Sequence, residues 1–190
     1  STAMSRKAQY HGSTNAAGQK HGFGELSYAS GDVFSGHWSN GQKSGHGVAL
    51  YANGARYDGQ WVADKKEGIG RFDFADGSSY AGAWRADRKS GLGIAKFTSG
   101  NVYVGHWEAD QMAGEGKFLY VAGDTYSGSW VANRKQGFGV WTSADGATTY
   151  AGGWDADLRH GDGLLLEGGV LLLVRHTHGV LESSGPAPDG

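Results

Sequence analysis

The sequence predicts an all-β fold: a single-layer, elongated and twisted antiparallel sheet of stacked β-hairpins. The first observation is a repeat, because tryptophan returns every 23 residues and, for the last copy, after 24: Trp38, Trp61, Trp84, Trp107, Trp130 and Trp154. A fixed period of this size is typical of repeat architectures. The other two observations are a two-residue alternation of side chains around each tryptophan and turn-favouring residues between the alternating segments.

Each repeat begins with an aromatic residue, a glycine and the tryptophan at alternate positions, as in Tyr80, Gly82 and Trp84. Alternation with period 2 places these three side chains on one face of a β-strand. A Gly-x-Gly pair such as Gly91 and Gly93 begins seven residues after the tryptophan and continues the alternation on a second strand. Because glycine has no Cβ, a neighbouring ring can lie flat over it, so one face is expected to consist of rings and glycines.

The turn between the two strands is predicted three residues after each tryptophan. This position holds only residue types that tolerate positive φ: Gly41, Asp64, Asp87, Asp110, Asn133 and Asp157. The connection to the next repeat also carries turn signals such as Asn53-Gly54 and Asp76-Gly77. Each repeat is therefore predicted to be a β-hairpin.

These units resemble MORN repeats, whose pattern is YxGxWxxGxxHGxGxxxxxxG. The resemblance covers Tyr10 to about Gly168 and implies a scaffold of stacked hairpins. The chain departs from the pattern in three ways. Asp or Asn replaces the turn glycine in five units, the histidine before Gly-x-Gly is present only as His21 and His160, and Thr14 stands where the first tryptophan belongs.

The repeats define the expected domain boundaries. Residues 1–9 are interpreted as a tag or flexible N-terminus, and residues 10–168 as about seven repeats, the first degenerate. Residues 169–182 are predicted to form a C-terminal capping or dimerisation strand, and residues 183–190 a disordered tail. One extra residue near Ala147 to Thr149 predicts a local irregularity before the last repeat. Ser1–Ala3 resemble a cloning scar ahead of Met4, which leaves open that the chain is a fragment.

Composition argues against several classes of function. A net charge of −2 and a pI near 6.4 disfavour nucleic acid as a partner. The absence of cysteine excludes disulfides and thiolate chemistry. We expect no membrane span and no signal peptide, and a cytoplasmic protein associated with the cytoskeleton or a membrane. The Gly-x-Gly pairs are not followed by GKS or GKT and no activated Ser, His and Asp are discernible, so neither catalysis nor a cofactor is expected.

The aromatic face is the main candidate for partner binding. A single layer cannot bury this face as a sandwich does, so part of it is expected to line a groove with the outer half of each ring exposed. Such a groove suits an apolar helix or peptide of another protein. The alternative is that the rings serve only as core. The candidate residues are Tyr57, Trp61, Tyr80, Trp84, Tyr103, Trp107, Tyr126 and Trp130.

The segment from Leu164 to Val174 is apolar on both faces and is predicted to form a hairpin around Gly168-Gly169. An apolar edge strand is exposed unless something covers it, which predicts a homodimer contact, with a folded-over cap as the alternative. The candidate dimerisation residues are Leu164, Leu166, Leu171, Leu172 and Leu173.

Basic residues follow most tryptophans by four or five positions and are expected to line up as a discontinuous ridge: Lys43, Lys65, Lys66, Arg88, Lys89, Arg134 and Lys135. Such a ridge can meet anionic phospholipid headgroups, whereas adjacent aspartates favour a merely solvated turn. No metal site is predicted; the weak candidates are His176 and His178, expected on one face of a strand, and two histidines alone rarely hold a metal.

Together these features favour a non-enzymatic scaffold or adaptor that binds other proteins and self-associates. The resemblance to MORN repeats implies cytoskeletal or membrane-associated assemblies. Two alternatives stay open: a module that binds phosphoinositides or other anionic lipids, and the targeting region of a larger enzyme.

Overall fold

The computed structural model describes residues 7–187, which form sixteen antiparallel strands and contain no helix. The chain divides into two compact units, Ser1–Ser90 and Gly91–Gly190. Unit 1 holds β1 (Gln9–Thr14), β2 (Lys20–Ser27), β3 (Val33–Ser39), β4 (Gln42–Leu50), β5 (Arg56–Val62), β6 (Lys65–Asp73) and β7 (Ser79–Arg85). The boundary falls within β8 (Arg88–Lys96). Unit 2 continues with β9 (Val102–Glu108), β10 (Gln111–Leu119), β11 (Thr125–Val131), β12 (Arg134–Thr142), β13 (Thr148–Asp155), β14 (Leu158–Glu167), β15 (Val170–Thr177) and β16 (Val180–Pro186).

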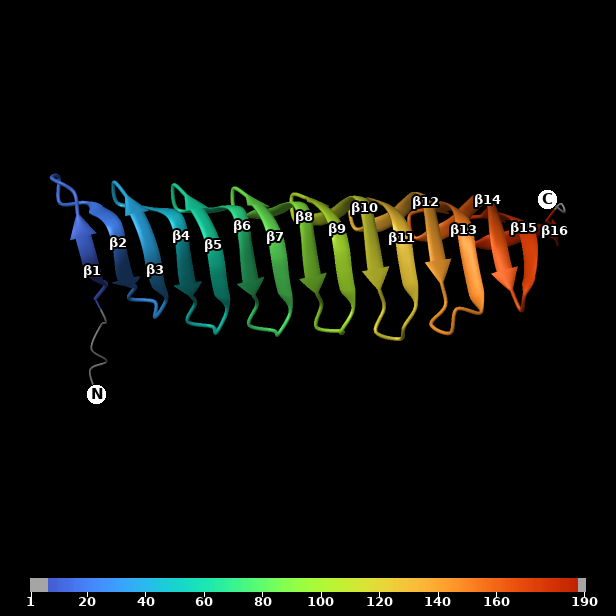
Figure 1. Cartoon of the computed structure of the whole chain (residues 1–190), viewed down its shortest axis with the longest axis horizontal. Coiled ribbons are helices and arrows are strands. Elements are labelled where there is room, and N and C mark those ends of the chain that lie inside the picture. The colour runs from blue at the N-terminus through green and yellow to red at the C-terminus, as the bar shows by residue number, and fades with distance from the viewer. Residues whose placement is uncertain (1–6, 188–190) are drawn as a thin grey trace. The chain divides into compact units, whose positions relative to one another are not determined.

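Within each unit the strands lie side by side in chain order (Figure 1). Each tryptophan-bearing strand pairs with the strand that follows it, so that Gly59 of β5 lies opposite Gly70 of β6. The next strand continues the same register, with Gly70 opposite Gly82 of β7. The predicted single layer of stacked antiparallel hairpins is confirmed.

The hairpin turns need two successive residues with positive φ, as in Ala63 (φ 48°) and Asp64 (φ 67°). This conformation matches the twist of the flanking strands and is costly for a residue with a Cβ. The aspartate adds an inter-repeat contact, since Asp64 Oδ1 accepts a hydrogen bond of 2.8 Å from the backbone N–H of Lys43. The predicted turn position is therefore also a link to the preceding hairpin.

The core consists of rings laid over glycines. Tyr57 is fully buried and lies across Gly59 and Gly70, where any Cβ would collide with its ring. Its hydroxyl donates to the carbonyl of Gln60 at 3.1 Å. Trp61 packs edge-on against Tyr57, with 5.1 Å between ring centroids, and its Nε1 donates to Gly47 O of the preceding repeat at 3.1 Å. The glycines thus provide space for rings that connect consecutive hairpins.

The C-terminal region differs from the expectation in two respects, the first being that a turn divides residues 169–182, predicted as one strand, between β15 and β16. The prediction of a disordered tail is wrong for residues 183–186, because they belong to β16, which pairs with β15; residues 188–190 lie outside the described part, as do residues 1–6. Strands β15 and β16 form an additional, eighth hairpin. The extra residue near Ala147 is absorbed in the turn, where Ser143 N–H donates to Thr148 O, and the register between β12 and β13 is regular.

Candidate functional site

The rings predicted to line a groove are buried. Tyr57, Tyr80, Tyr103 and Tyr126 have no exposed surface, and the four tryptophans of the candidate set are only 3–5% exposed. The expectation that the outer half of each ring stays exposed is therefore wrong. The rings are covered by the neighbouring repeats and by long side chains that lie over them.

A lysine covers the rings at the same position of most repeats. The ammonium of Lys43 lies 4.6 Å from the ring centroid of Trp61, 5.1 Å from that of Phe34 and 5.4 Å from that of Tyr28. A cation at this distance is attracted by the ring electrons. Lys135 and Arg159 are placed in the same way, with Lys135 4.6 Å from Trp154 and Arg159 4.5 Å from Tyr150.

The partial burial of these lysines shifts their pKa values. Burial lowers the pKa of Lys43 and of Lys135, while the carboxylate of Asp64 acts in the opposite direction on Lys43 and that of Asp157 on Lys135. In one repeat the cation is replaced by Met112, which is buried. The shared task of this position is thus to cover rings, and charge is not required for it.

The accessible part of the aromatic face is a second set of rings at the turns between hairpins. We call it the aromatic–lysine row; in unit 1 it comprises Tyr28, Lys43, Tyr51, Phe74 and Lys89, and its counterpart in unit 2 comprises Phe97, Tyr120 and Lys135. Each of these side chains is half-buried. The ammonium of Lys89 lies 5.4 Å from the centroid of Phe74, and Tyr51 stacks on Phe72 at 5.6 Å. Burial raises the pKa of Tyr51 to about 12, so its hydroxyl remains a hydrogen-bond donor at neutral pH.

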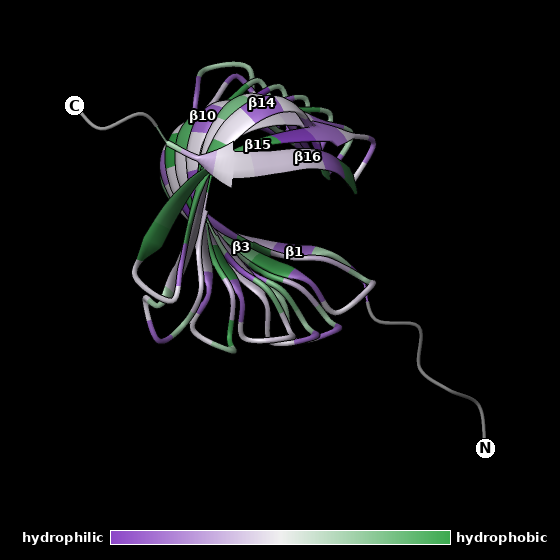
Figure 2. Cartoon of the chain, turned by 90° about the vertical axis from the view of Figure 1, so that its right-hand side faces the viewer, coloured by the Kyte–Doolittle hydropathy of each residue, from purple (hydrophilic) through white to green (hydrophobic). Residues whose placement is uncertain are grey.

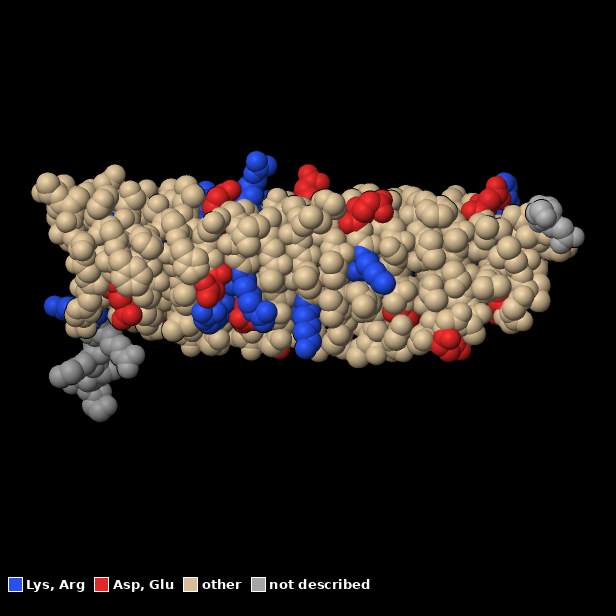
Figure 3. Space-filling model, in the orientation of Figure 1, with Lys and Arg blue, Asp and Glu red and all other residues tan. Residues whose placement is uncertain are grey.

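The predicted basic ridge is divided between two environments. Lys43, Lys66, Lys89 and Lys135 are half-buried over rings, whereas Lys65, Arg88 and Arg134 are exposed. Adjacent residues of a strand point to opposite faces of the sheet, which is why Lys65 is exposed whereas Lys66 lies over rings. Figure 3 shows acidic side chains interspersed among the basic ones on one face.

Four of the five predicted dimerisation leucines lie together. Leu164 pairs with Leu173 and Leu166 pairs with Leu171, on the face opposite the rings, and all four are exposed. Leu172 pairs with Leu165 and faces the other side, where it is half-buried. These leucines belong to β14 and β15, which Figure 2 shows beside β16, the last strand of unit 2.

The face opposite the rings also carries exposed apolar side chains that the sequence analysis did not single out. They occupy the middle of Gly-x-Gly in several repeats: Phe23, Ile69, Leu92 and Phe138. The alternation that places both glycines on the aromatic face is the signal that would have found them, because it turns the residue between them outward.

The sequence model of the MORN repeat matches seven consecutive segments: residues 16–33, 34–56, 57–79, 80–102, 103–125, 126–148 and 150–165. The chain belongs to the MORN-repeat family. No curated protein matches it.

Several solved structures are similar to this MORN-repeat chain at low sequence identity. The TCP domain of Drosophila melanogaster SAS-4 (dCPAP), in complex with a proline-rich motif of Ana2 (dSTIL), has a TM-score of 0.53 and 16% identity, covering 93% of this chain and 94% of that one. The TCP10c domain of Drosophila melanogaster Sas-4 has a TM-score of 0.47 and 16% identity, covering 89% and 99%. The TCP10 domain of Danio rerio CPAP, in complex with a STIL peptide, has a TM-score of 0.46 and 14% identity, covering 90% and 86%.

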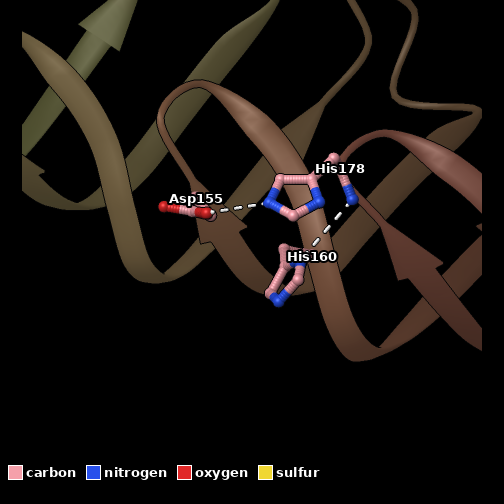
Figure 4. Close-up of side chains that lie close together, drawn as sticks. All are labelled: Asp155, His160 and His178. Carbon is pink, nitrogen blue, oxygen red and sulfur yellow. Dashed lines mark hydrogen bonds and ion pairs between the residues drawn. The ribbon is translucent and has the colours of Figure 1, made fainter.

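The two weak metal candidates, His176 and His178, lie in different environments. His176 is buried at the position that tryptophan occupies in the MORN repeats, packs edge-on against Tyr150 and leaves its Nδ1 without a hydrogen-bond partner. His178 lies instead in the turn after β15, with a φ of 45°, next to Asp155 and His160 (Figure 4). The sequence pattern does not reveal this group, because its members come from three different segments.

Among residues 7–187, no helix has the length and apolar character that crossing a bilayer requires.

Proposed function

We propose that this MORN-repeat chain is a non-enzymatic scaffold that binds a helix or extended segment of another protein along the aromatic–lysine row. The observation that carries the proposal is the regular recurrence of half-buried rings beside lysine ammonium groups, as at Tyr28 with Lys43 and Phe74 with Lys89. The buried tyrosines and tryptophans then support these rings from below.

The spacing of the row suits a linear partner. Each repeat contributes two strands about 4.8 Å apart, so equivalent rings within a unit recur about every 10 Å. Seven residues of an α-helix rise about 10.5 Å, and three residues of an extended chain span about 10 Å. A partner with apolar residues at either interval, and acidic residues between them for Lys43 and Lys89, would match both features of the row.

Half-buried aromatic rings are effective anchors because they bury much area at little cost in side-chain entropy. The SAS-4 TCP domain was solved with a proline-rich motif of another protein, so a sheet of this fold can carry a segment of a partner. Membership of the MORN-repeat family suggests cytoskeletal or membrane-associated assemblies as the setting of such binding.

The test is selection of binding peptides from a display library, followed by calorimetry with the selected peptides. Tyr51→Ala combined with Phe74→Ala should weaken binding by more than about tenfold, since each aromatic anchor contributes on the order of 1 kcal/mol or more. The matched control is Ile69→Ala, which removes an exposed apolar side chain from the opposite face of the same unit.

Loss of binding in the Ile69→Ala chain but not in the double variant would contradict the proposal and place the partner on the opposite face. Binding to anionic vesicles that is abolished by Arg88→Glu with Arg134→Glu, without any peptide ligand, would instead favour the lipid-binding alternative through the exposed bases.

Self-association is the second part of the proposal. It is supported by the exposed cluster of Leu164, Leu166, Leu171 and Leu173 on one face of unit 2. Light scattering of the purified chain, whose monomer mass is 20.0 kDa, should give twice that mass. Leu171→Asp with Leu173→Asp should restore the monomer with unchanged circular dichroism, while Leu172→Asp probes the other face. A monomer in the unaltered chain would show that the leucines merely cap the sheet.

A further inference from the structure

The end of unit 2 holds a cluster of three metal-ligand side chains. Asp155 ends β13, His160 lies in β14 and His178 lies in the turn between β15 and β16, and Figure 4 shows the three converging. Each offers one ligand atom, and these atoms all lie within 4.8 Å of one another. Within residues 7–187 this is the one group of three or more such residues that meets this distance.

We propose that Asp155, His160 and His178 form a binding site for a divalent transition metal, with zinc the best fit. Two imidazoles and one carboxylate are a ligand set that zinc accepts, with a fourth position left for water. At ligand distances of about 2.0–2.1 Å, the edge of a zinc tetrahedron is about 3.4 Å long. His178 Nε2 and Asp155 Oδ2 are already 3.3 Å apart, which is close to this edge length. The metal would bind between these two atoms, and the His160 ring would move toward it as the third ligand.

Comparison with the other repeats separates this cluster from ordinary turn capping. At the position of His160 other repeats carry Glu67 or Gln136, whose side-chain oxygen accepts the backbone N–H of the next turn at 2.9 and 3.1 Å. The contact from His178 N–H to His160 Nδ1 is longer, at 3.4 Å. The positions of Asp155 and His178 hold Val62 and Ala86 in the repeat of Glu67. Among the described hairpins, only the last one therefore has three possible metal ligands where the other repeats have a single side chain that caps the turn.

The metal would connect the last hairpin to the repeat before it. Its ligands connect β13 and β14, the last regular repeat, with the turn of β15–β16, where His176 replaces the tryptophan. A metal that binds only the native arrangement stabilises it. Since His178 and Asp155 are 62% and 39% exposed, the metal would be reachable from solvent.

Calorimetric titration of the full chain with zinc chloride tests the proposal. We expect one zinc per chain. Substitutions taken from other repeats keep the fold: His178→Ala places the residue found at Ala86 or Ala156, and His160→Gln the residue found at Gln136. Each should weaken zinc binding by more than about tenfold, because two ligands alone rarely hold zinc. Zinc should also slow hydrogen exchange of the β16 amides in the unaltered chain and in neither variant.

The matched control is His46→Ala. His46 Nε2 and Asp58 Oδ1 form a pair of 2.9 Å with exposures of 64% and 32%, close to those of His178 and Asp155, but that pair belongs to no group of three ligands. His46→Ala should leave zinc binding unchanged. The proposal is overturned if the unaltered chain takes up no stoichiometric zinc, if His178→Ala and His160→Gln bind zinc as tightly as it does, or if His46→Ala loses as much.

Discussion

The regular MORN hairpins and the hairpin β15–β16 pair with the preceding hairpin in the same register and differ in the side chains that this register brings together. In β5, Tyr57, Gly59 and Trp61 lie opposite Ala49, Gly47 and Gly45. In β15, Leu172, Val174 and His176 lie opposite Leu165, Gly163 and Gly161. The eighth hairpin therefore keeps the register of the repeat without its aromatic residues.

This difference indicates that the register of a hairpin and the stability of that hairpin depend on different side chains. The ladder continues into β16 although no ring lies over glycine there, so pairing along the sheet does not require the rings. The regular repeats add rings with defined partners, such as the bond from Trp154 Nε1 to Gly139 O at 3.1 Å. We infer that the aromatic residues supply most of the stability of a hairpin, and that β15–β16 is the first to open.

The strongest test of this comparison truncates the same position in both kinds of hairpin. Tyr57→Ala should cost about 3–5 kcal/mol, because it leaves a cavity over two glycines and removes the hydrogen bond to Gln60. Leu172→Ala should cost about 1 kcal/mol, since Leu172 is only half-buried. Urea denaturation monitored by tryptophan fluorescence measures both. Equal losses would show that the rings have no special part in stability.

A second test gives β15–β16 the residue that it lacks. His176→Trp replaces a buried ring that has an unpartnered nitrogen with the tryptophan of the regular repeats. A new hydrogen bond from its Nε1 to Gly163 O would match the other repeats and stabilise the hairpin by about 1 kcal/mol. Protection of the β16 amides against hydrogen exchange should rise accordingly. A fall in protection would mean that the site is too small for the larger ring.

The same two regions show how much of the fold can be predicted from the sequence. The 23-residue step and the alternation around Trp84 predict the regular hairpins, because both reflect local strand geometry. The sequence predicts β15 as an arm of the hairpin around Gly168-Gly169 but not the pairing of β15 with β16, since Leu172, Val174 and His176 keep the alternation but not the residue types. The tail residues that form β16 carry few strand-favouring side chains, and their pairing depends on the edge that β15 offers.

The candidate site was predicted less well, because it depends on contacts between repeats. Alternation places Tyr57 and Trp61 on one face, but their burial depends on a lysine that lies over rings of its own hairpin and of the next one, as Lys43 lies over Phe34 and Trp61. The zinc ligands show the same limitation, since Asp155 and His178 are brought together by the stacking of successive hairpins.

A third, smaller effect concerns pH. Burial, and next to it the charge of Arg159, lower the pKa of His176 below its ordinary value of 6.5. The unfolded hairpin therefore binds a proton more readily than the folded one. Stability is fully present above about pH 6.5 and is lost as the pH falls from there toward the lower pKa of the folded state. Protection factors of the β16 amides should drop between pH 7.5 and 5.5, and His176→Trp should remove this dependence. An equal drop in β5 would contradict a local cause.

The smallest effect is expected where the regular repeats already differ among themselves. Lys43→Met puts the residue of Met112 over the rings of Phe34 and Trp61. The variant loses a cation–ring attraction. It also avoids the unfavourable burial of an ammonium group, and this burial is the reason why the pKa of Lys43 is lowered. The hydrogen bond from Lys43 N–H to Asp64 is a backbone bond and persists. The free energy of unfolding should therefore change by less than about 1 kcal/mol, and the reverse variant Met112→Lys should change it by a similar amount. A loss comparable to that of Tyr57→Ala would mean that the lysine, and not only the ring beneath it, holds the regular hairpins together.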